Sequence, residues 1–382
     1  MIPRIYSKKV RDKLRKFPAV ALLGPRQCGK TTLAKQLGGV YFDMETEGSE
    51  ARLDAEWETL ARGKRLIVID EAQQTPKVFS RLRGTIDADR KRHGRFLLLG
   101  SVSPVLMRNV SESLAGRLGL VHMTPLILPE LKTGQMDDLW LCGGYPDGGI
   151  LTPDMFPEWQ EDYIESLVTR DLPNWGLPAK PQLTMRLLAM LAAVHGQPLN
   201  ASQLGASLAL DHKTVVSYCD FLEAAFLIRR LQSYSTNITK RLVKSPRVLW
   251  RDSGVRHALM NVKDLDHLYR QPWLGHSWEG FVIEQTLATI DAVGKRVQPY
   301  FFRTSDGYEL DLVLDWGDER WAVEIKLTSN PSREMIDRLN TTADLIKATR
   351  RILICRTARK IENDRVLAIN PTGWLRRITD SA

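Results

Sequence analysis

Two sets of residues in this chain have the types and spacing of groups that act on phosphates. The first lies in ALLGPRQCGKTTL (residues 21–33), which contains the pattern G-x-x-x-x-G-K-[ST]. In such a loop the glycines let the backbone wrap around phosphates, so that successive N–H groups point at them. A lysine reaches the β- and γ-phosphates, and a hydroxyl binds Mg²⁺. The predicted nucleotide-binding residues are Gly24, Pro25, Arg26, Gln27, Cys28, Gly29, Lys30, Thr31 and Thr32.

The rest of this first site is predicted from three later segments. RLIVIDEAQ (65–73) ends an apolar run in Asp70, placed to bind Mg²⁺, and Glu71, placed to polarise the attacking water. FLLLGS (96–101) ends in Ser101, which either senses the γ-phosphate or is a serine in a turn. SLAGR ends in Arg117, which either completes a site or caps the preceding helix.

The second set lies in ELDLVLDWGDERWAVEIK (309–326), which reads as two strands joined by a turn at WGDE. Because side chains alternate along a strand, Asp311, Glu324 and Lys326 share one face. Two carboxylates there could hold Mg²⁺, and a lysine could position water beside a phosphodiester. An upstream helix could bring Glu279, or less favourably Glu284, to the same metal. The alternative is a polar sheet face with a salt bridge between glutamate and lysine.

The phosphate loop needs a particular set of elements around it. AVALL (19–23) precedes it as a short apolar strand and TLAKQL follows as a helix. The apolar runs in RLIVID and FLLLGS contain no polar alternation, which indicates strands buried on both faces, as in a parallel sheet. The N-terminal third is therefore predicted to be an α/β domain with a parallel sheet.

The middle of the chain is predicted to contain three helices. Gly196–Pro198 ends the first, Asn200 with Gln203 caps the second, and Asp211 caps the third. The last two have helix-turn-helix spacing, and the third would expose His212, Lys213, Thr214, Ser217 and Tyr218. Such a unit binds DNA or serves as a spacer between proteins. The predicted DNA-binding residues are Lys213 and Thr214, with Lys240, Arg241, Lys244, Arg247 and Arg251 as wing residues that follow a phosphate backbone.

Composition favours a polyanionic partner. The 382 residues carry a net charge of +9, and residues 179–256 contain eleven Lys/Arg against four Asp/Glu. The four cysteines are scattered without a C-x-x-C pair, which favours a reducing cytoplasm over a disulfide framework or zinc site. No apolar run has transmembrane length, so no membrane association is expected.

The motifs occur in an order that resembles one family. GPRQCGKTTL, YFDMET, IDEAQ, LLLGSVSP, ESLAGR, GGYP, TRDL, KSPRVLWRDSG and WEGFVIEQ together are similar to bacterial and archaeal AAA+ ATPases with a long-uncharacterised C-terminal region. By this resemblance Arg117 would be a trans-acting arginine finger in a homo-oligomeric, hexameric ring. The hairpin resembles the PD-(D/E)xK nuclease fold, including archaeal junction resolvases.

The expected fold is α/β, with four segments along the chain. These are an AAA+ ATPase domain (1–150), a linker or reduced lid (151–184), a winged-helix domain (185–260) and a PD-(D/E)xK nuclease-like domain (261–382). The expected function is ATP hydrolysis, with Mg²⁺, that moves or remodels DNA. The DNA would be recognised by its structure rather than its sequence, and branched DNA such as a Holliday junction is the candidate substrate. The alternatives are an ATP-gated, metal-dependent nuclease acting in defence, and a nucleotide-controlled switch that binds DNA or protein.

Overall fold

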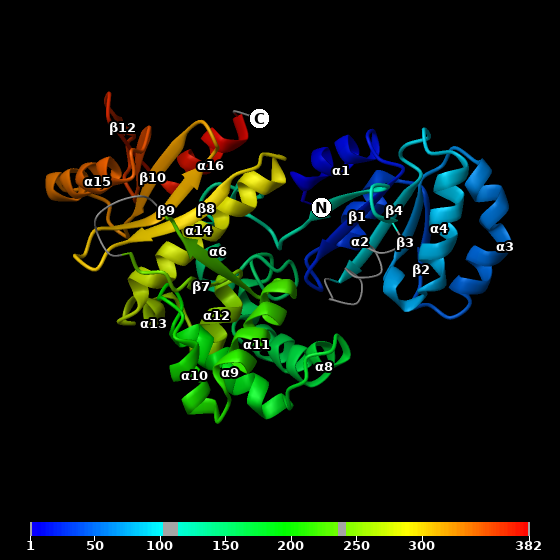
Figure 1. The fold of residues 1–382 in the computed structure, drawn as a ribbon, viewed down its shortest axis with the longest axis horizontal. Coiled ribbons are helices and arrows are strands. Elements are labelled where there is room, and N and C mark those ends of the chain that lie inside the picture. The colour runs from blue at the N-terminus through cyan, green and yellow to red at the C-terminus, as the bar shows by residue number, and fades with distance from the viewer. Residues whose placement is uncertain (1, 102–113, 236–241, 381–382) are drawn as a thin grey trace. The chain divides into compact units, whose positions relative to one another are not determined.

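The computed structural model describes residues 2–101, 114–235 and 242–380, which form two compact units. The first unit holds Met1–Leu126 with the short segments Asn174–Gly176 and Ala224–Phe226, and the second holds the remainder from Ile127 onward. Each unit has its own sheet, and each is described here by itself (Figure 1).

The first unit is built on a five-stranded parallel sheet with the order β2-β3-β4-β1-β5. Its strands are β1 (Ala19–Gly24), β2 (Val40–Asp43), β3 (Ile67–Asp70), β4 (Phe96–Ser101) and β5 (Leu118–His122). The parallel sheet predicted from the apolar runs is confirmed, because β1 and β3 are buried along their whole length. Parallel strands end at one edge, so the carboxyl ends of β1, β3 and β4 lie together.

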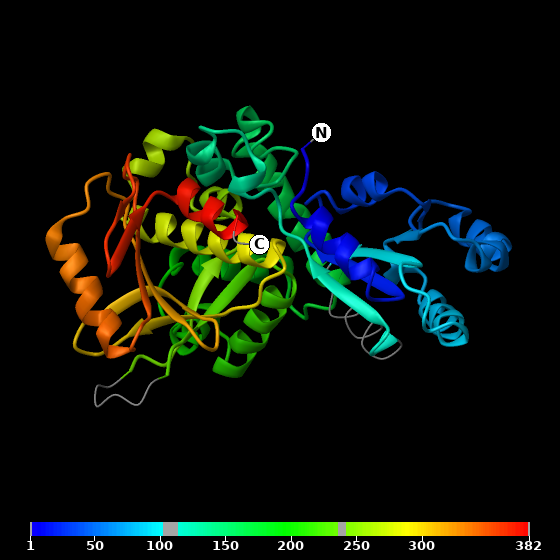
Figure 2. The same cartoon turned by 90° about the horizontal axis from the view of Figure 1, so that it is seen from above.

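The helices of this unit pack along the sheet (Figures 1 and 2). They are α1 (Tyr6–Leu14), α2 (Lys30–Leu37), α3 (Ser49–Arg62) and α4 (Lys77–Ala88), with a 3₁₀ turn at Ala72–Gln74. Buried side chains of α3 and α4, including Trp57 and Leu82, share one core with alternate residues of β1, β3 and β4. This packing fixes the strands whose ends carry the phosphate loop and the acidic pair.

The second unit begins with helices. These are α6 (Met136–Cys142), α7 (Glu158–Ser166), α8 (Leu172–Asn174), α9 (Pro181–Ala193), α10 (Ala201–Leu208), α11 (His212–Ala224), α12 (Ser253–Leu259) and α13 (Leu265–Tyr269), with 3₁₀ turns at Leu128–Glu130 and Pro153–Met155 and a π-helical turn at Leu167–Asp171. The three predicted middle helices are α9, α10 and α11. Two predicted caps are present, because Asn200 accepts a bond from Gln203 N and Asp211 from Thr214 N, each at 3.0 Å.

An eight-stranded mixed sheet completes this unit, in the order β12-β13-β11-β10-β9-β8-β6-β7. The strands are β6 (Ile228–Ser233), β7 (Arg247–Trp250), β8 (Gln298–Arg303), β9 (Glu309–Asp315), β10 (Arg320–Ile325), β11 (Arg350–Ile354), β12 (Ile361–Glu362) and β13 (Val366–Ile369). The predicted hairpin is β9 and β10, which pair antiparallel. The segment 240–251, which contains β7, was expected to be a wing. In the structure β7 pairs with β6, which also pairs with β8, so both strands join the larger sheet.

Helices cover both faces of this sheet. On one face, α15 (Arg333–Leu345) packs on Ala322 through Leu339 and Ala343. On the other face lie α14 (Leu274–Ala292) and α16 (Pro371–Asp380), joined by a 3.0 Å bond from Trp374 Nε1 to Thr286. The sheet runs through the predicted middle and C-terminal segments, so these share one compact unit. The boundaries predicted at 150, 184 and 260 stay predictions.

Within the ranges that the structure describes, none of the helices combines the length and apolar character needed to cross a bilayer.

Candidate functional site

The phosphate loop lies between β1 and α2, and its glycines are required by the backbone. Gly29 has φ +94°, in the left-handed region that glycine adopts without strain. A Cβ on Gly24 would lie 2.3 Å from the carbonyl oxygen of Met123, on the segment after β5. Gln27 also has positive φ, 60°. The loop therefore makes a tight turn that leads directly into the N-terminus of α2.

Lys30 is buried and folds back over this loop. Its Nζ donates to the carbonyl oxygens of Gly24 at 3.0 Å and Pro25 at 2.8 Å. The ammonium is thus held at the mouth of the loop, close to the N-terminal N–H groups of α2. The helix dipole and the ammonium both favour an anion there. Arg26 forms an ion pair with Glu45 at 3.5 Å, and Cys28 is buried beside Met123.

Thr31 and Asp70 come together from α2 and β3, 39 residues apart. The Thr31 hydroxyl donates to Asp70 Oδ2 at 2.7 Å, and Glu71 N donates to Asp70 Oδ1 at 3.0 Å. A hydroxyl and a carboxylate in this contact are the protein groups that hold Mg²⁺ beside a nucleoside triphosphate, whose remaining ligands are phosphate oxygens and water. The described residues contain no group of three or more His, Cys, Asp or Glu placed to hold a metal. A Mg²⁺ ion bound with a nucleotide does not need such a group, because only Thr31 and Asp70 would be its protein ligands.

Tyr41 is a site residue that the sequence analysis missed. Its hydroxyl donates to Asp70 Oδ2 at 2.6 Å, from the strand beside β3. Burial and this bond to the carboxylate raise the pKa of the Tyr41 hydroxyl, so it stays a donor. The sequence shows that YFD ends a short strand. It does not show that this strand, β2, pairs with β3.

Glu71 lies one residue beyond β3 in the left-handed conformation, with φ 48°. Its carboxylate accepts from a different partner than that of Asp70, because Gln73 Nε2 donates to Glu71 Oε2. Strained φ values in non-glycine residues concentrate at functional sites.

Ser101 ends β4 beside the loop, since its Cα is paired with that of Gly24. The strand β4 also pairs with β3, so Ser101 has the position between loop and acidic pair that the sequence predicted. Arg117 is held within its own chain: Nε and Nη2 donate to the two Asp87 oxygens at 2.8 and 2.9 Å. It also donates to the carbonyl of Ala115. A role in a neighbouring subunit requires release from Asp87.

A second candidate site is a pocket of about 410 Å³ in the C-terminal sheet. Its walls include all four residues predicted for metal-dependent chemistry, which are Glu279, Asp311, Glu324 and Lys326. Lys326 Nζ lies 2.6 Å from Glu324 Oε1 and 3.5 Å from Asp311 Oδ2. Asp311 also accepts a 2.8 Å bond from the backbone N–H of Ile325. The four residues therefore line one pocket, with Lys326 in contact with Asp311 and Glu324, but within the described ranges no three acidic, His or Cys side chains are placed to hold a metal.

The electrostatics of this pocket are those of crowded acids. Burial and the negative charge of Asp311 raise the pKa of Glu279 to about 8 and that of Glu324 to about 7. Burial opposes the charge on Lys326, but Asp311 and Glu324 outweigh it and raise the lysine pKa. Glu284, the less favoured helix residue, lies elsewhere and pairs with Arg229 at 2.5 Å.

Arg247 was predicted to contact DNA, but it is part of this acidic cluster. It is only 3% exposed, its Nη1 lies 3.8 Å from Asp311, and its Nη2 donates to Glu309. The placement follows from β7 joining the C-terminal sheet rather than projecting as a wing. A guanidinium buried among carboxylates cannot follow a phosphate backbone in solvent.

The other predicted DNA-binding residues divide into three groups. Lys213 and Lys244 are exposed, whereas Thr214 is partly covered and its hydroxyl bonds to Asp211. Arg251 lies 3.7 Å from Glu284 and is largely covered. Lys240 and Arg241 lie outside the described residues. Tyr218, expected at the surface of α11, is buried, with its hydroxyl donating to Pro178 O at 2.9 Å.

The local positive surplus of residues 179–256 therefore has an internal explanation. Arg229, Arg247 and Arg251 pair with Glu284, Glu309 and Asp311, which all lie beyond residue 256. Arg256 is buried and donates to Ala192 O. Much of the charge that indicated a contact surface is neutralised inside the unit.

The motifs GGYP and RDSG form one structural joint that sequence reasoning did not identify. Asp252 caps α12 by accepting from Val255 N at 3.0 Å, and it also accepts from Gly144 N at 2.8 Å. Burial raises the pKa of Asp252 to about 6. A Cβ on Gly254 would lie 1.9 Å from Cys142 O, and one on Gly143 would lie 2.1 Å from Asp252. These glycines allow α6 and α12 to approach closely.

Comparisons with known proteins agree with the site in the first unit. Residues 16–132 match the model of an AAA domain. Residues 133–266 and 274–374 match two models described as domains of unknown function, DUF8612 and DUF4143. Sheet order, phosphate loop and acidic pair therefore belong to the class of AAA-type P-loop ATPase domains.

Two relatives extend the similarity beyond this domain. The chain is 38% identical over 329 residues to "Uncharacterized protein Rv2008c" of Mycobacterium tuberculosis and, equally, to "Uncharacterized protein Mb2031c" of Mycobacterium bovis. Each match covers 85% of this chain and 74% of the relative. The chain belongs to the same family as these mycobacterial proteins, a family of P-loop ATPases.

Solved structures are more distant. The Walker-type ATPase paby2304 of Pyrococcus abyssi matches with a TM-score of 0.46 and 15% identity, covering 67% of this chain and 94% of that one. Protein VC1899 from Vibrio cholerae matches with a TM-score of 0.20 and 11% identity, covering 95% and 96%.

Proposed function

We propose that this protein hydrolyses ATP at the phosphate loop of its first unit and uses the turnover to move or remodel DNA. The observation that carries the ATPase part is the 2.7 Å bond between Thr31 and Asp70, next to a lysine that closes over the loop. Isolated strand-end acids and isolated lysines are common. The combination of hydroxyl, carboxylate and ammonium at one sheet edge is specific to phosphoryl transfer from a triphosphate.

Each residue of the site has a definite task in this proposal. Lys30 exchanges its two carbonyl contacts for the β- and γ-phosphates. Thr31 and Asp70 hold Mg²⁺, which when bound neutralises charge on those phosphates. Glu71 accepts a proton from, or orients, the attacking water.

The DNA part of the proposal is supported by charge and by resemblance. The chain has a net charge of +9, and Lys213 and Lys244 are exposed on the second unit. Contacts of single lysines with phosphates are independent of sequence, so recognition of DNA structure is the expected mode. Four-way DNA is the substrate to test first, given the likeness to junction resolvases.

ATPase turnover on a panel of DNA structures tests this proposal. Four-way, forked, linear double-stranded and single-stranded DNA are compared with no DNA, at low salt where phosphate contacts are strongest. The proposal expects turnover to rise with at least one of them, and to respond less to DNA in Lys213→Ala than in the control Lys263→Ala. If no DNA changes the rate of ATP hydrolysis, the protein is an ATPase that DNA does not stimulate, and a nucleotide-controlled binding switch is favoured.

A second candidate function is metal-dependent cleavage of a phosphodiester at the acidic pocket. One observation favours it: five carboxylates and a lysine line one cavity, and Lys326 contacts both Asp311 and Glu324. Against it, Arg247 and Lys326 already neutralise part of the acidic charge, which is the salt-bridged alternative.

Incubation of plasmid DNA with the protein and Mg²⁺ or Mn²⁺ separates these two interpretations. Nicking that disappears in Asp311→Ala, but persists in the control Asp318→Ala from the exposed β9–β10 turn, supports cleavage. DNA that stays intact with every metal, while Asp311→Ala lowers the thermal midpoint, supports a structural ion cluster.

A further inference from the structure

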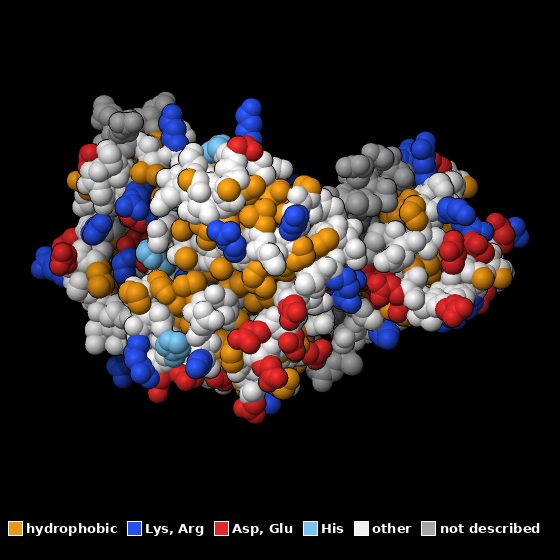
Figure 3. Space-filling model, turned by 90° about the horizontal axis from the view of Figure 1, so that it is seen from below, with side chains coloured by type: hydrophobic (Ala, Val, Ile, Leu, Met, Phe, Trp, Pro, Cys, Tyr) orange, Lys and Arg blue, Asp and Glu red, His pale blue; other side chains and the backbone are white. Residues whose placement is uncertain are grey.

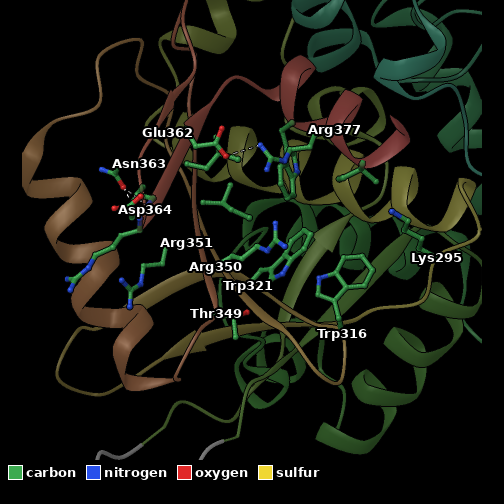
Figure 4. A pocket seen from close by; sticks show the side chains of 16 residues that line it. Lys295, Trp316, Trp321, Thr349, Arg350, Arg351, Glu362, Asn363, Asp364 and Arg377 are labelled. Carbon is green, nitrogen blue, oxygen red and sulfur yellow. Dashed lines mark hydrogen bonds and ion pairs between the residues drawn. The ribbon is translucent and has the colours of Figure 1, made fainter. Parts of the chain in front are cut away.

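A different pocket on the second unit has the size and the lining residues that are typical of a ligand-binding site. It has a volume of about 440 Å³ and lies among β10, β11, β13 and α16 (Figure 4). Ligand pockets of proteins have volumes of about 300–1,000 Å³ and combine apolar or aromatic walls with a few charged groups. None of its lining residues lines the acidic pocket.

The two pockets lie on opposite faces of the sheet. Trp321 and Glu324 are three residues apart on β10, and alternation places their side chains on opposite sides. Trp321 faces α16, since its ring lies 6.0 Å from that of Trp374. Glu324 faces α15 together with Met335 and Arg338. The pocket is therefore independent of the candidate cleavage site.

Flat rings form one wall of this pocket. Trp316 and Trp321 are half-buried, and their ring centroids lie 5.1 Å apart with planes inclined by 53°. The guanidinium of Arg350 lies 5.1 Å from the Trp321 centroid, over its ring. Figure 4 shows Arg350, Trp321 and Trp316 next to one another. Indole and guanidinium planes are the surfaces on which nucleobases stack.

Positive charge surrounds these rings. The lining contains five cations, Lys295, Arg350, Arg351, Arg365 and Arg377, against two acids, Glu362 and Asp364.

The arginines are available to an anion at modest cost. Arg350 pairs with Glu319 at 3.3 Å and Arg377 with Glu362 at 3.1 Å, both at exposed positions. Exposed ion pairs contribute only about 0–1 kcal/mol each, so a phosphate can replace these partners. Arg365 is exposed and has no carboxylate partner within the described ranges. In Figure 4, Arg377 lies above the tryptophans and Lys295 to their right.

One hydrogen-bond donor at the aromatic wall is also unused. The indole N–H of Trp316 is buried without an acceptor in the part of the chain that the structure describes, whereas that of Trp321 donates to Glu319 at 2.8 Å. A buried donor left without an acceptor is unfavourable by about 1–3 kcal/mol. A ligand with an acceptor at its ring edge could satisfy it.

We propose that this pocket binds a nucleotide unit, with the base against Trp316, Trp321 and Arg350 and a phosphate at the arginines of the rim. The proposal names the shared chemistry of two sources, a free nucleotide and one unpaired residue of a single-stranded nucleic acid. It is separate from hydrolysis at the phosphate loop and does not require it.

The test measures binding to full-length protein that carries Lys30→Ala, so that the phosphate loop does not capture the probe. One arm titrates AMP by calorimetry, and the other titrates fluorescein-labelled oligothymidine by fluorescence anisotropy. Binding of AMP identifies a free nucleotide as the source, and binding of oligothymidine alone identifies a single strand.

Added to this background, Trp321→Ala should weaken whichever probe binds by about tenfold or more, since stacking on one aromatic ring contributes about 1–3 kcal/mol. Trp321→Phe keeps a ring and should bind within threefold of the parent, which guards against a folding defect in the alanine variant. Arg377→Glu should also weaken binding, whereas Arg333→Glu, on the exposed surface of α15, should not.

Two results would overturn the proposal: no binding of either probe to the parent, or equal binding by parent, Trp321→Ala and Arg377→Glu. These outcomes are distinguishable from failure of the proposed function. If neither probe binds but DNA still stimulates the ATPase equally in Arg377→Glu and parent, this pocket is refuted and the DNA-dependent motor remains. If AMP binds but no DNA stimulates the ATPase, the pocket is supported and the DNA-dependent motor is refuted.

Discussion

At the scale of single residues, the first site is organised around Asp70. Thr31, Tyr41 and the Glu71 N–H all donate to its carboxylate, from α2, from β2 and from the residue after β3. Three donors fix the rotation of the carboxylate before any ligand arrives, which is the preorganisation that phosphoryl transfer requires. The Glu71 carboxylate is outside this set and accepts from Gln73 instead.

Replacing Glu71 by Gln should separate binding from hydrolysis. Glutamine keeps the size of the side chain but cannot accept a proton, and loss of a general base lowers turnover by about 10²–10⁴-fold. ATP affinity, measured with a fluorescent analogue, should change little. The exposed Glu58→Gln is the control. Parent-like turnover in Glu71→Gln would remove this residue from the chemistry.

The raised pKa of Glu279 predicts how stability depends on pH. Its ordinary value is 4.5 and its value in the folded protein is about 8, so the folded state binds this proton more tightly than the unfolded state. The stabilisation is fully present below pH 4.5 and is lost as pH rises through about 8. Thermal unfolding over this range should show a falling midpoint. Glu279→Gln should flatten the fall, and Glu334→Gln, on the exposed rim of the same pocket, should not.

At the scale of elements, local sequence patterns predicted most of the architecture. The apolar runs predicted β1, β3 and β4, and the caps at Asn200 and Asp211 predicted the starts of α10 and α11. The alternation in 308–326 predicted the β9–β10 hairpin and the shared face of Asp311 and Glu324. These features depend on neighbours a few positions away, which a single sequence displays.

Features that depend on distant partners were not predictable. Nothing near Arg247 indicates that β6 pairs with β8, yet that pairing turns a supposed wing arginine into a buried partner of Asp311. Likewise, Tyr41 reaches Asp70 only because β2 lies beside β3. Part of the basic surplus of the middle segment likewise has acidic partners in later strands and helices, which the segment itself does not show.

The close approach of α12 to α6 gives a prediction at this scale. A methyl group at Gly254 would lie 1.9 Å from Cys142 O, so the helices must separate. Gly254→Ala should destabilise the second unit by about 1–3 kcal/mol. Denaturant unfolding measures this, with Gly275→Ala as the control because a methyl group there meets no atom within 4 Å. Equal loss in both variants would indicate a general helix effect and refute the joint.

At the scale of the whole molecule, the two units differ in their sheets and in where their candidate sites lie. The first is a parallel sheet with chemistry at its carboxyl edge. The second buries a few charged residues, such as Arg247 and Asp311, and has pockets on both faces of its sheet. Basic, acidic and apolar side chains are exposed on the face that Figure 3 shows. The proposed function assigns energy conversion to the first unit and partner binding to the second.

Assembly into a ring predicts that Arg117 acts on a neighbouring subunit. An arginine finger contributes about 10³–10⁵-fold to turnover, so Arg117→Ala should be nearly inactive. Lys30→Ala should be inactive as well. A mixture of the two should recover activity, because an intact loop then meets an intact arginine at some interfaces. Asp87→Asn loses one partner of the ion pair and should stay active.

If the mixture does not recover activity, the role of Arg117 is structural, through its ion pair with Asp87. The same follows if Arg117→Ala keeps parent-like turnover and only unfolds at a lower temperature.

ATP hydrolysis by the purified protein with and without Lys30 tests the central claim most directly. The parent should release phosphate in the presence of Mg²⁺, and Lys30→Ala should lower the rate by about 10²-fold or more, because the charge that stabilises the transferring phosphoryl group is lost. Lys64→Ala, at an exposed position after α3, should match the parent. Phosphate release that is equal in the parent and in Lys30→Ala, or absent from the parent under every condition that supports ATP binding, would contradict the account.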